Sequence, residues 1–522
     1  MRHTLRCRWP TVVALAGLAI FLFVSLRHLD SVPQVYEDEP WQASTAYKLA
    51  TRGVFGSDLF AGFMHMDERY YGFMPLHPFL LAAIFKFAGT DRMLGEARLE
   101  TVALTAATLI LTYALGSRLF SKPVGGVAVL VLVLVRWTGL TYIQLTGIPL
   151  VDFARIARYD PLVPVLGLAS LHVYISARNR QSLPLYAASG ILASASGLAH
   201  VYGLFWIPAL VMLTILDRPA SLARCVALFA VGALLPWLPY AAYVLNDLPD
   251  WRGQIAVYAS RFELLNPHWY VNNILEEFHR YGPGLGPFGP AWLLRPGVWF
   301  LAVALPLSLF ALARRALAGD VSARTLVVPS LTFPVLFALL ITLKLVNYTL
   351  IELPLFALAV AWGSVSLWQR PLPGVGLAAP RLLLIALGAG IAIEGAFALA
   401  RIDSATATPY PVFASEVRQL IPPGARVLGL HTYWIGLEDF DYRSFLVPLN
   451  EADLGVPLDQ ALDAVDPDVV LLDPRMRTYF ESLPPGGDAE RFETWLARHS
   501  AREIGRIDDP TYGQMIVYLL KR

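Results

Sequence analysis

The sequence predicts an all-α, polytopic membrane domain over residues 1–402, followed by a small soluble α/β domain over residues 403–522. Of the 522 residues, 56% are hydrophobic and only 16% are charged, against roughly 25% charged residues in an ordinary soluble domain. Such a composition excludes a single soluble domain, a disordered chain, a collagen and a coiled coil. The net charge of +1 also excludes a nucleic-acid-binding protein that acts through bulk positive charge.

The near-neutral total charge conceals two unlike parts. Residues 403–522 contain 19 acidic and 11 basic residues, a net charge of −8, which leaves 21 acidic and 30 basic residues, a net charge of +9, in residues 1–402. This shift predicts a domain boundary near residue 402. Within the acidic tail we expect strands at Arg426–Leu430, Asp468–Leu472 and Ile516–Leu520, and helices at Leu458–Val465 and Asp488–His499.

Apolar segments that can cross a hydrocarbon core about 30 Å thick recur along the first domain. About eleven transmembrane helices are expected, and the first is read as an uncleaved helix rather than a signal peptide. They lie at 11–29, 99–117, 123–145, 161–177, 183–199, 201–216, 225–245, 297–313, 325–343, 349–368 and 381–400.

Basic residues in the short connections predict the orientation of these helices. With Arg2, Arg6 and Arg8 in the cytoplasm, every short Lys- and Arg-containing loop falls on the cytoplasmic side, as the positive-inside rule expects. A bacterial inner or plasma membrane is the expected location. The opposite, extracytoplasmic side then receives the long segments 30–98, 146–160 and 246–296, together with the tail.

Two stretches of the first external segment are too short to span a membrane. Pro75–Phe87 is apolar but is interrupted by His77 and Lys86, which favours an interfacial or re-entrant helix. A second helix of this kind is expected at Trp41–Thr51, where polar residues recur at three- and four-residue spacing.

Three consecutive acids, Glu37, Asp38 and Glu39, open the first external segment directly after the first span. Adjacent carboxylates repel one another, so one of them should have a raised pKa unless a cation lies close by. A carboxylate beside a bilayer is costly and often functional. A solvated cap at the membrane surface explains this feature, taken alone, equally well.

The second external segment carries alternating acids and bases, Asp152, Arg155, Arg158 and Asp160. In a helix, Asp152 and Arg155 share one face and Arg158 lies beside them. Arginines at this depth suit an anionic headgroup or a phosphate. Asp160, which precedes Pro161, is equally well explained as the residue that begins the next helix.

A third polar group, Lys344, Tyr348 and Glu352, lies on the same predicted side. A lone lysine beside a span usually extends its ammonium to the interface, whereas a glutamate within an apolar run is paired or functional. Carboxylates and fixed cations on one side of the membrane are the groups needed to move a substituent from a phosphate donor to a hydroxyl. A carboxylate removes the acceptor proton, and cations stabilise the departing phosphate.

These motifs, taken in order, resemble the GT-C glycosyltransferase superfamily, and within it the lipid A aminoarabinose transferase and protein O-mannosyltransferase group. The resemblance covers roughly residues 1–365 and predicts a GT-C-type fold. It is carried by the acidic pair Asp38-Glu39, the basic loop Gly116–Lys122, the A-R-x-A-x-x-D-x-L pattern of Ala154–Leu162, and the late K-x-x-x-Y-x-x-x-x-x-P element of Lys344, Tyr348 and Pro354.

The resemblance implies that a sugar is transferred, with inversion, from a polyprenyl-phosphate donor to an extracytoplasmic glycan, lipid or protein. Relatives use pentose, mannose or aminoarabinose donors, so the sugar stays open. The resemblance implies Asp38 as the base and Glu39 as its partner at the catalytic site. The implied substrate-binding residues are Asp152, Arg155, Arg158, Asp160, His200, Lys344 and Tyr348.

In the roles that the resemblance implies, Asp160 and Glu39 position acceptor or sugar, and Arg155, Arg158 and Lys344 hold the phosphate. His200 stands where relatives commonly have a lysine. It either titrates near neutral pH and compensates for that cation, or simply packs between helices.

No cofactor is expected, because the carboxylates form no dedicated metal cage and a basic phosphate clamp makes a divalent ion less necessary. The competing class is a transporter or flippase for lipid-linked sugars. That class predicts inverted repeats and charges near the centres of broken helices, whereas the charges here cluster at the external ends of the predicted spans.

Overall fold

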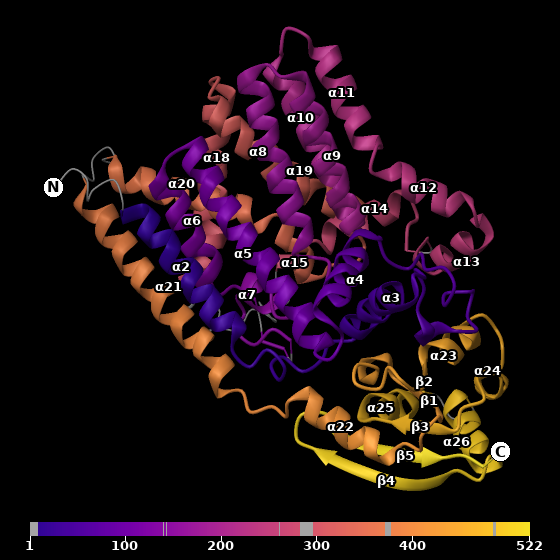
Figure 1. Ribbon diagram of the computed structural model, residues 1–522. Helices are drawn as coiled ribbons and strands as arrows, with labels where there is room; N and C mark the ends of the chain where they lie inside the picture. The colour runs from indigo at the N-terminus through magenta and orange to yellow at the C-terminus, as the bar shows by residue number, and fades with distance from the viewer. Residues whose placement is uncertain are drawn as a thin grey trace.

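The computed structural model describes residues 9–521 except 139, 142, 260, 282–295, 371–376 and 484–486. Arg2, Arg6 and Arg8, which entered the orientation argument, lie outside the described residues. The described chain is mostly helical, and a small sheet forms near its C-terminus (Figure 1).

All regular elements in the first half of the described chain are helices. Its helices, with 3-10 turns marked η, are α2 (Trp9–Leu26), α3 (Asp38–Arg52), η1 (Asp58–Phe60), α4 (Leu76–Ala88), α5 (Met93–Leu119), α6 (Lys122–Leu134), α7 (Pro149–Phe153), α8 (Leu162–Arg180), α9 (Leu183–Ala199), η2 (Val201–Phe205), α10 (Trp206–Asp217), α11 (Leu222–Leu234), α12 (Trp237–Leu245), α13 (Leu248–Ala259), α14 (Pro267–Leu275) and α15 (Phe278–Tyr281).

The second half begins with helices and ends in a mixed unit. Its elements are α17 (Pro296–Trp299), the π-helical turn η3 (Phe300–Ala304), α18 (Leu305–Leu317), α19 (Val321–Leu340), η4 (Val346–Ile351), α20 (Leu353–Gln369), α21 (Ala378–Ser404), α22 (Tyr410–Leu420), β1 (Arg426–Gly429), η5 (His431–Tyr433), β2 (Asp441–Ser444), α23 (Leu446–Asp453), α24 (Leu458–Val465), β3 (Val469–Leu472), α25 (Pro474–Ser482), α26 (Asp488–Arg498), β4 (Arg502–Asp509) and β5 (Gly513–Leu519).

Several helices meet the length and hydropathy that a membrane span requires. Five do so alone, namely α2, α5, Gly297–Leu317, α19 and α21, and the pair α11 and α12, bent by 47°, makes a sixth within the described residues. The other predicted spans fall on α8 and on the shorter apolar helices α6, α9, α10 and α20. These helices fit a multi-pass membrane protein, and the total of eleven spans stays a prediction.

The predicted span 123–145 is wrong in its second half. Helix α6 ends at Leu134, and Val135 has extended backbone angles. The charged Arg136 follows immediately, and the backbone N–H of Trp137 donates to the carbonyl of Gly147 at 3.0 Å. A loop that folds back on itself therefore replaces the expected continuation of the helix.

Close helix packing explains how α9 and α11 lie against each other. A Cβ added at Gly190 of α9 would stand 2.1 Å from the carbonyl oxygen of Phe229, and one at Gly232 of α11 would stand 2.1 Å from that of Ala187. Only glycine permits this backbone approach, the usual device by which apolar helices associate in a bilayer.

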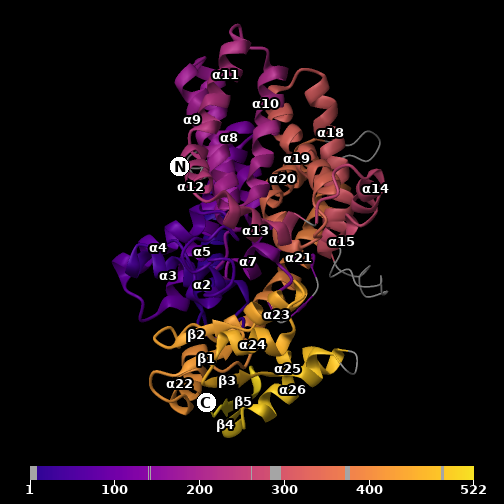
Figure 2. The same cartoon turned by 90° about the vertical axis from the view of Figure 1, so that its right-hand side faces the viewer.

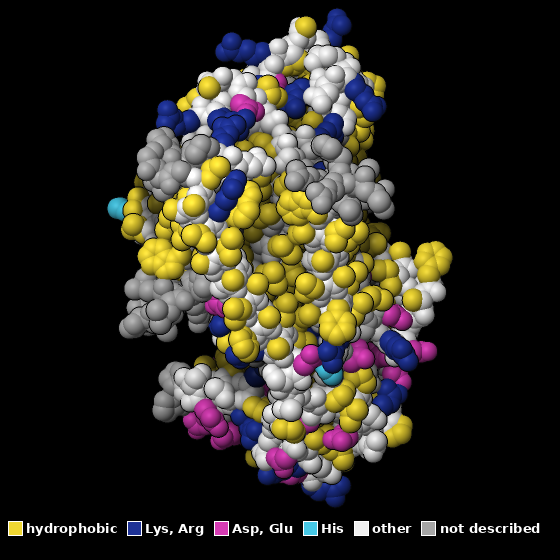
Figure 3. Space-filling model, turned by 90° about the vertical axis from the view of Figure 1, so that its left-hand side faces the viewer, with side chains coloured by type: hydrophobic (Ala, Val, Ile, Leu, Met, Phe, Trp, Pro, Cys, Tyr) yellow, Lys and Arg dark blue, Asp and Glu magenta, His cyan; other side chains and the backbone are white. Residues whose placement is uncertain are grey.

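The surface is divided into bands of different polarity. Figure 3 shows hydrophobic side chains gathered across the middle of the molecule, mostly Lys and Arg among the charged residues near its upper end, and acidic and basic residues mixed near its lower end. At the upper end, Asp217 accepts from Arg178 at 3.3 Å and also from Arg324. Loops that were predicted to be cytoplasmic thus lie together at one end, beyond the apolar band.

The tail forms a five-stranded sheet of order β2-β1-β3-β5-β4. Strands β2, β1 and β3 are parallel, and β5 is antiparallel to both β3 and β4. The strands expected around 426–430, 468–472 and 516–520 are present as β1, β3 and β5, and the two expected helices are α24 and α26. Strands β2 and β4 were missed, since both are edge strands rich in charged residues, and β4 has no fully buried position.

The tail packs directly on the first external segment, beneath α3 and α4 (Figures 1 and 2). Both helices predicted in that segment are present, and α3 ends at Arg52, followed by Gly53, whose φ of 71° is left-handed. One continuous apolar core joins Val35, Ala43 and Phe60 of the segment to Tyr410 and Trp434 of the tail. The segment and the tail therefore form one packed unit outside the apolar band.

Candidate functional site

Three parts of the chain that are distant in sequence meet at Arg158. Its guanidinium donates to a carboxylate oxygen of Asp38 and, at 2.7 Å, to Oδ2 of Asp160. The side-chain amide of Asn347 donates to the other oxygen of Asp160 at 3.0 Å. The first external segment, the second external segment and the turn η4 thus share one polar cluster.

Local structure explains why these side chains converge. Asp38 is in the first turn of α3, where the helix N-terminus favours a negative charge, and its side chain keeps an exposed fraction of 22%. Asp160 precedes Pro161 at the start of α8. Asp160 therefore adjoins the start of α8 and also belongs to the Arg158 cluster. A role in beginning the helix and a role in the site are thus compatible for this residue.

The carboxyl of Asp38 is electrostatically unusual. Burial raises its pKa, the Arg158 guanidinium opposes that shift, and the nearby Asp160 and Glu39 raise the pKa further. Raising the pKa of a carboxylate towards neutrality makes it a better general base.

Aromatic side chains surround the cluster on one side. Tyr159 stacks on His200 with ring centroids 4.4 Å apart, and Tyr348 meets Tyr202 edge to face at 4.4 Å. The guanidinium of Arg158 lies 5.2 Å from the ring centroid of Tyr159. These rings form the wall between the Arg158 cluster and a cavity.

That cavity has a volume of about 310 Å³ and opens beside the site. It combines an aromatic lining with a cation, Arg261, which lies over the ring of Tyr258 at 5.1 Å. Such a mainly apolar pocket with a few polar groups is typical of a ligand site. Its lining includes Tyr71, Phe73, Met74, Tyr159, His200, Tyr202, Tyr258, Arg261, Leu343 and Tyr348.

His200 lies between α9 and η2 and lines the cavity. Its Nδ1 accepts from the backbone N–H of Tyr202 at 3.4 Å. Burial lowers its pKa to about 4. The negative charge of Asp160 opposes this shift, and the positive charge of Arg158 adds to it. The imidazole is therefore neutral at physiological pH, so of the two alternatives for His200 the packed, neutral ring fits this environment.

Lys344 is close to the cavity in sequence but belongs to a second charge cluster. Its ammonium donates to Glu277 Oε2 at 2.6 Å. The same carboxylate accepts from Arg280 at 2.7 Å. Tyr348 lines the cavity between the two clusters, and its ring centroid lies 5.9 Å from the guanidinium of Arg280.

Glu39 adjoins Asp38 in sequence but lies in the protein interior. Its two carboxylate oxygens accept hydrogen bonds from two guanidinium nitrogens of Arg98, each at 2.8 Å. Both side chains are fully buried. The backbone N–H groups of Tyr36 and Ala157 also donate to it at 2.8 Å. Four donors thus fix the first external segment to the second, and they leave Glu39 outside the cavity lining.

Arg155 and Asp152 also lie outside the cavity lining. Both terminal nitrogens of Arg155 donate to backbone carbonyls at and beyond the end of α2, including Ser25 at 2.7 Å and Arg27 at 2.7 Å. An arginine placed there satisfies the last carbonyls of the helix. Asp152 accepts at 2.9 Å from the backbone and the hydroxyl of Thr146.

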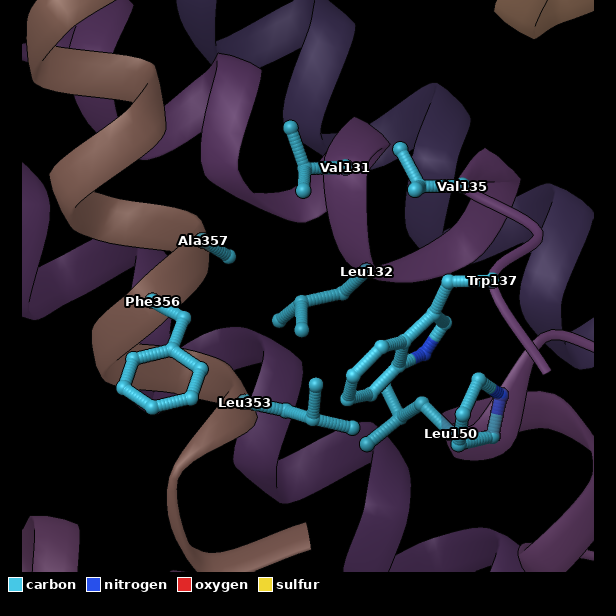
Figure 4. Close-up of a pocket in the computed structure, with 9 residues that line it drawn as sticks. Val131, Leu132, Val135, Trp137, Leu150, Leu353, Phe356 and Ala357 are labelled. Carbon is cyan, nitrogen blue, oxygen red and sulfur yellow. The ribbon is translucent and has the colours of Figure 1, made fainter. Parts of the chain in front are cut away.

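Other cavities lie among the helices. One of about 700 Å³ between α6, α20 and α21 is mostly apolar, although its lining includes Ser364, Gln369 and Arg381. A small cavity of about 20 Å³ between α6, α7 and α20 is lined by apolar residues, among them Leu132, Trp137, Leu353 and Phe356 (Figure 4). Among the described residues, no group of three or more His, Cys, Asp or Glu side chains is arranged to hold a metal ion. The expectation that the reaction needs no metal stays a prediction.

Several residues at the site were not found from the sequence. Arg98 stands at the edge of a predicted span, and only its contact with Glu39 reveals its purpose. Glu277 and Arg280 are three residues apart on the short segment that ends in α15, and the sequence does not show that they meet Lys344. Arg261 and Tyr258 carry no recognisable motif.

The fold matches solved structures, although no family model matches the sequence and no curated protein matches it. ArnT from Cupriavidus metallidurans in the apo state aligns with a TM-score of 0.59 at 14% identity, over 97% of this chain and 98% of that chain. The same enzyme bound to undecaprenyl phosphate aligns with a TM-score of 0.58 at 14% identity, over 98% of this chain and 97% of that one.

An archaeal oligosaccharyltransferase aligns almost as well. AglB from Archaeoglobus fulgidus, in complex with an inhibitory peptide and a dolichol-phosphate, gives a TM-score of 0.56 at 12% identity, over 97% of this chain and 74% of that chain. The chain therefore has the GT-C fold of ArnT and AglB, as the sequence motifs predicted.

Proposed function

We propose that the protein transfers a sugar from a polyprenyl-phosphate donor to a hydroxyl of an extracytoplasmic acceptor, with inversion at the anomeric carbon. The observation that carries this proposal is the contact of one buried arginine, Arg158, with both Asp38 and Asp160 beside the cavity of about 310 Å³. The GT-C fold adds support, since the matched ArnT structure holds undecaprenyl phosphate and the matched AglB structure holds dolichol-phosphate.

In the proposed reaction Asp38 removes the proton from the acceptor hydroxyl. The oxygen attacks the anomeric carbon, the bond from that carbon to the phosphate oxygen breaks, and the polyprenyl phosphate leaves with the electron pair. Arg158 neutralises Asp160 and orients Asp38 through its hydrogen bonds. The cations around the cavity stabilise the charge that develops on the departing phosphate.

The residues of the cluster receive different roles in this proposal. Asp38 is the base, and Asp160 holds Arg158 and the sugar. Asn347 fixes Asp160, and Tyr348 and His200 form the aromatic wall. Glu39, Asp152 and Arg155 are assigned to the architecture of the external segments, because each is already held by backbone or arginine partners. We also propose a cytoplasmic N-terminus and an extracytoplasmic domain at 403–522.

The direct test uses the purified full-length chain in lipid nanodiscs. Synthetic undecaprenyl-phosphate sugars with hexose, pentose and aminopentose headgroups are supplied, and release of undecaprenyl phosphate is followed by mass spectrometry. Release with at least one headgroup is expected. Movement of intact lipid-linked sugar across sealed vesicles, with no release in any of these assays, contradicts the proposal and supports the flippase class.

Arg158→Gln should move the pH dependence of the reaction. Arg158 lowers the pKa of Asp38, so removing it raises that pKa further. A base acts when deprotonated, so the acidic limb of the rate profile should shift to higher pH, and the maximal rate should fall. The measurement is the initial rate of sugar release across a pH series.

The exposed Arg92, in the same external segment, provides a matched control, and Arg92→Gln should keep the wild-type profile. A profile for Arg158→Gln that falls in height but keeps its acidic limb in place contradicts the assignment of Asp38 as the titrating base.

A further inference from the structure

A groove lies between α6, α20 and α21, at the end of the membrane domain away from the Arg158 cluster. Helix α20 begins beside η4 and runs away from that cluster to Gln369, and α21 then leads back along the outside of the bundle to the tail (Figure 1). The groove is lined by the last turns of α20, the first half of α21 and one face of α6. Its volume of about 700 Å³ is within the range of roughly 300–1,000 Å³ that is usual for ligand pockets.

The inner end of the groove is closed by helix packing. There α21 approaches α6 so closely that a Cβ added at Gly395 would stand 2.6 Å from the carbonyl oxygen of Leu134. Val135, Val360 and Ile391 form a small buried cluster at the same end. Nearer the start of α21, by contrast, the groove lies between the two helices. The groove is therefore a wedge that is closed near the middle of the membrane domain.

The walls of this wedge are apolar and as deep as one leaflet of a bilayer. On α21 the lining extends from Arg381 to Ala392, and a rise of about 1.5 Å per residue makes this about 17 Å. A whole hydrocarbon core is about 30 Å thick. The facing wall of α6 presents Val127, Val131 and Leu134 at three- and four-residue spacing, and these side chains are only half-buried. Such walls fit an acyl chain.

The charged and aromatic groups of the groove gather at its outer end. The guanidinium of Arg381 lies 5.4 Å from the ring centroid of Trp368, and its Nε donates to the carbonyl oxygen of the same residue at 3.1 Å. Trp9 and Gln369 line this end as well. Within the described part of the chain, no carboxylate lines the groove or contacts Arg381. Tryptophan favours the headgroup region, and an arginine without an acidic partner suits a phosphate.

We propose that this groove binds an anionic phospholipid, with its phosphate on Arg381 and an acyl chain between α6 and α21. The lipid comes from the leaflet opposite the Arg158 cluster, which is the cytoplasmic leaflet in the proposed orientation. A lipid with net negative charge is favoured over a zwitterionic one, because the groove offers a cation and no acid. The bound chain covers the half-buried walls of both helices and fastens α21, which leads directly into the tail, to the bundle.

The test uses the purified full-length chain in detergent micelles and measures bound lipids by native mass spectrometry. Dioleoyl phosphatidylglycerol, which is anionic, is compared with dioleoyl phosphatidylcholine, which has the same chains and a zwitterionic headgroup. The first phosphatidylglycerol should bind on the order of fivefold more tightly than the first phosphatidylcholine, and it should raise the melting temperature more. Equal affinities and equal melting temperatures overturn the proposal.

Arg381→Gln tests the place of the headgroup. This variant should bind the two lipids equally, because the charge that distinguishes them is gone. The matched control is Arg314→Gln, since Arg314 is an exposed arginine in the last turn of α18 and lies outside the groove lining. The control should keep the preference for phosphatidylglycerol. A preference that persists in Arg381→Gln overturns the assignment of the phosphate to Arg381.

Gly388→Leu tests the place of the acyl chain. Gly388 lines the groove, yet a Cβ added there meets no atom within 4 Å, so a leucine fits and occupies the space of the chain. Leucine also favours a helix more than glycine does, so the variant should fold. Its affinity for phosphatidylglycerol should fall about tenfold or more. Ala386→Leu, at an exposed position of α21 outside the lining, should bind as the wild type does. Wild-type affinity in Gly388→Leu overturns the proposal.

A competition experiment decides between a phospholipid and a polyprenyl lipid. Undecaprenyl phosphate should not displace the first phosphatidylglycerol from the wild type. Displacement that occurs in the wild type and is lost in Gly388→Leu assigns the groove to a polyprenyl chain and overturns the phospholipid. None of these measurements depends on sugar transfer, so the failure of the proposed function and the failure of this inference are distinguishable.

Discussion

Asp38→Asn should lower the rate of sugar transfer by about 10² to 10⁴, the usual contribution of a positioned general base. The asparagine has nearly the same shape and can still accept from Arg158, so the protein should remain folded. Its affinity for undecaprenyl phosphate should change little, because the substitution removes the base and leaves the cations in place. Initial rates of release, binding isotherms and thermal melts of the purified variant measure these three quantities.

The control for this substitution is Asp403→Asn. Asp403 is a half-exposed aspartate that pairs with Arg27 at 2.8 Å and takes no part in the Arg158 cluster, so its substitution should preserve the rate. Full activity of Asp38→Asn removes this residue from the chemistry. If the variant loses both its activity and its folded state, Asp38 has a structural role and is not shown to be the base.

Glu39→Gln should destabilise the protein by about 3–5 kcal/mol, the cost of breaking a buried ion pair by removing one partner. Glu39 and Arg98 are both fully buried, and the carboxylate accepts four hydrogen bonds. Glutamine can accept with one oxygen only, and it leaves the charge of Arg98 without a counterion. Chemical denaturation in mixed micelles gives the free energy of unfolding.

Glu37→Gln supplies the comparison for stability. Glu37 is two residues away, its side chain is 49% exposed, and its partner Arg475 is 3.2 Å distant. Exposed pairs of this kind contribute little, so the unfolding free energy should stay close to the wild-type value. Equal stabilities of the Glu39 and Glu37 variants disprove the structural role given to Glu39.

The sequence predicted the helical membrane class and the position of most helices because long apolar runs have few alternatives to a helix in a bilayer. The end of α6 was mispredicted, since hydropathy averaged over a window extends across Arg136 when strongly apolar residues precede it. Strands β2 and β4 were missed for a related reason. Both are edge strands rich in charged residues, so their hydrophobic pattern is weak.

The candidate site was partly predictable. Asp38, Arg158, Asp160 and Tyr348 follow recognisable motifs, and the structure brings them to one side of the membrane domain. Motifs do not separate Asp38, which contacts Arg158 beside the cavity, from the neighbouring Glu39, which is fully buried against Arg98. That distinction depends on which way α3 is rotated, and the rotation is set by Arg98, a residue far along the chain.

The continuous core between the first external segment and the tail has a consequence for biogenesis. Ribosomes complete residues 30–98 long before residues 410–520, yet Phe60 and Trp434 belong to the same packed cluster. The early segment therefore keeps the apolar side chains of this core uncovered until the tail has been synthesised. Because each piece covers apolar side chains of the other, we expect a chimaera that exchanges only one of the two pieces to be less stable than either parent.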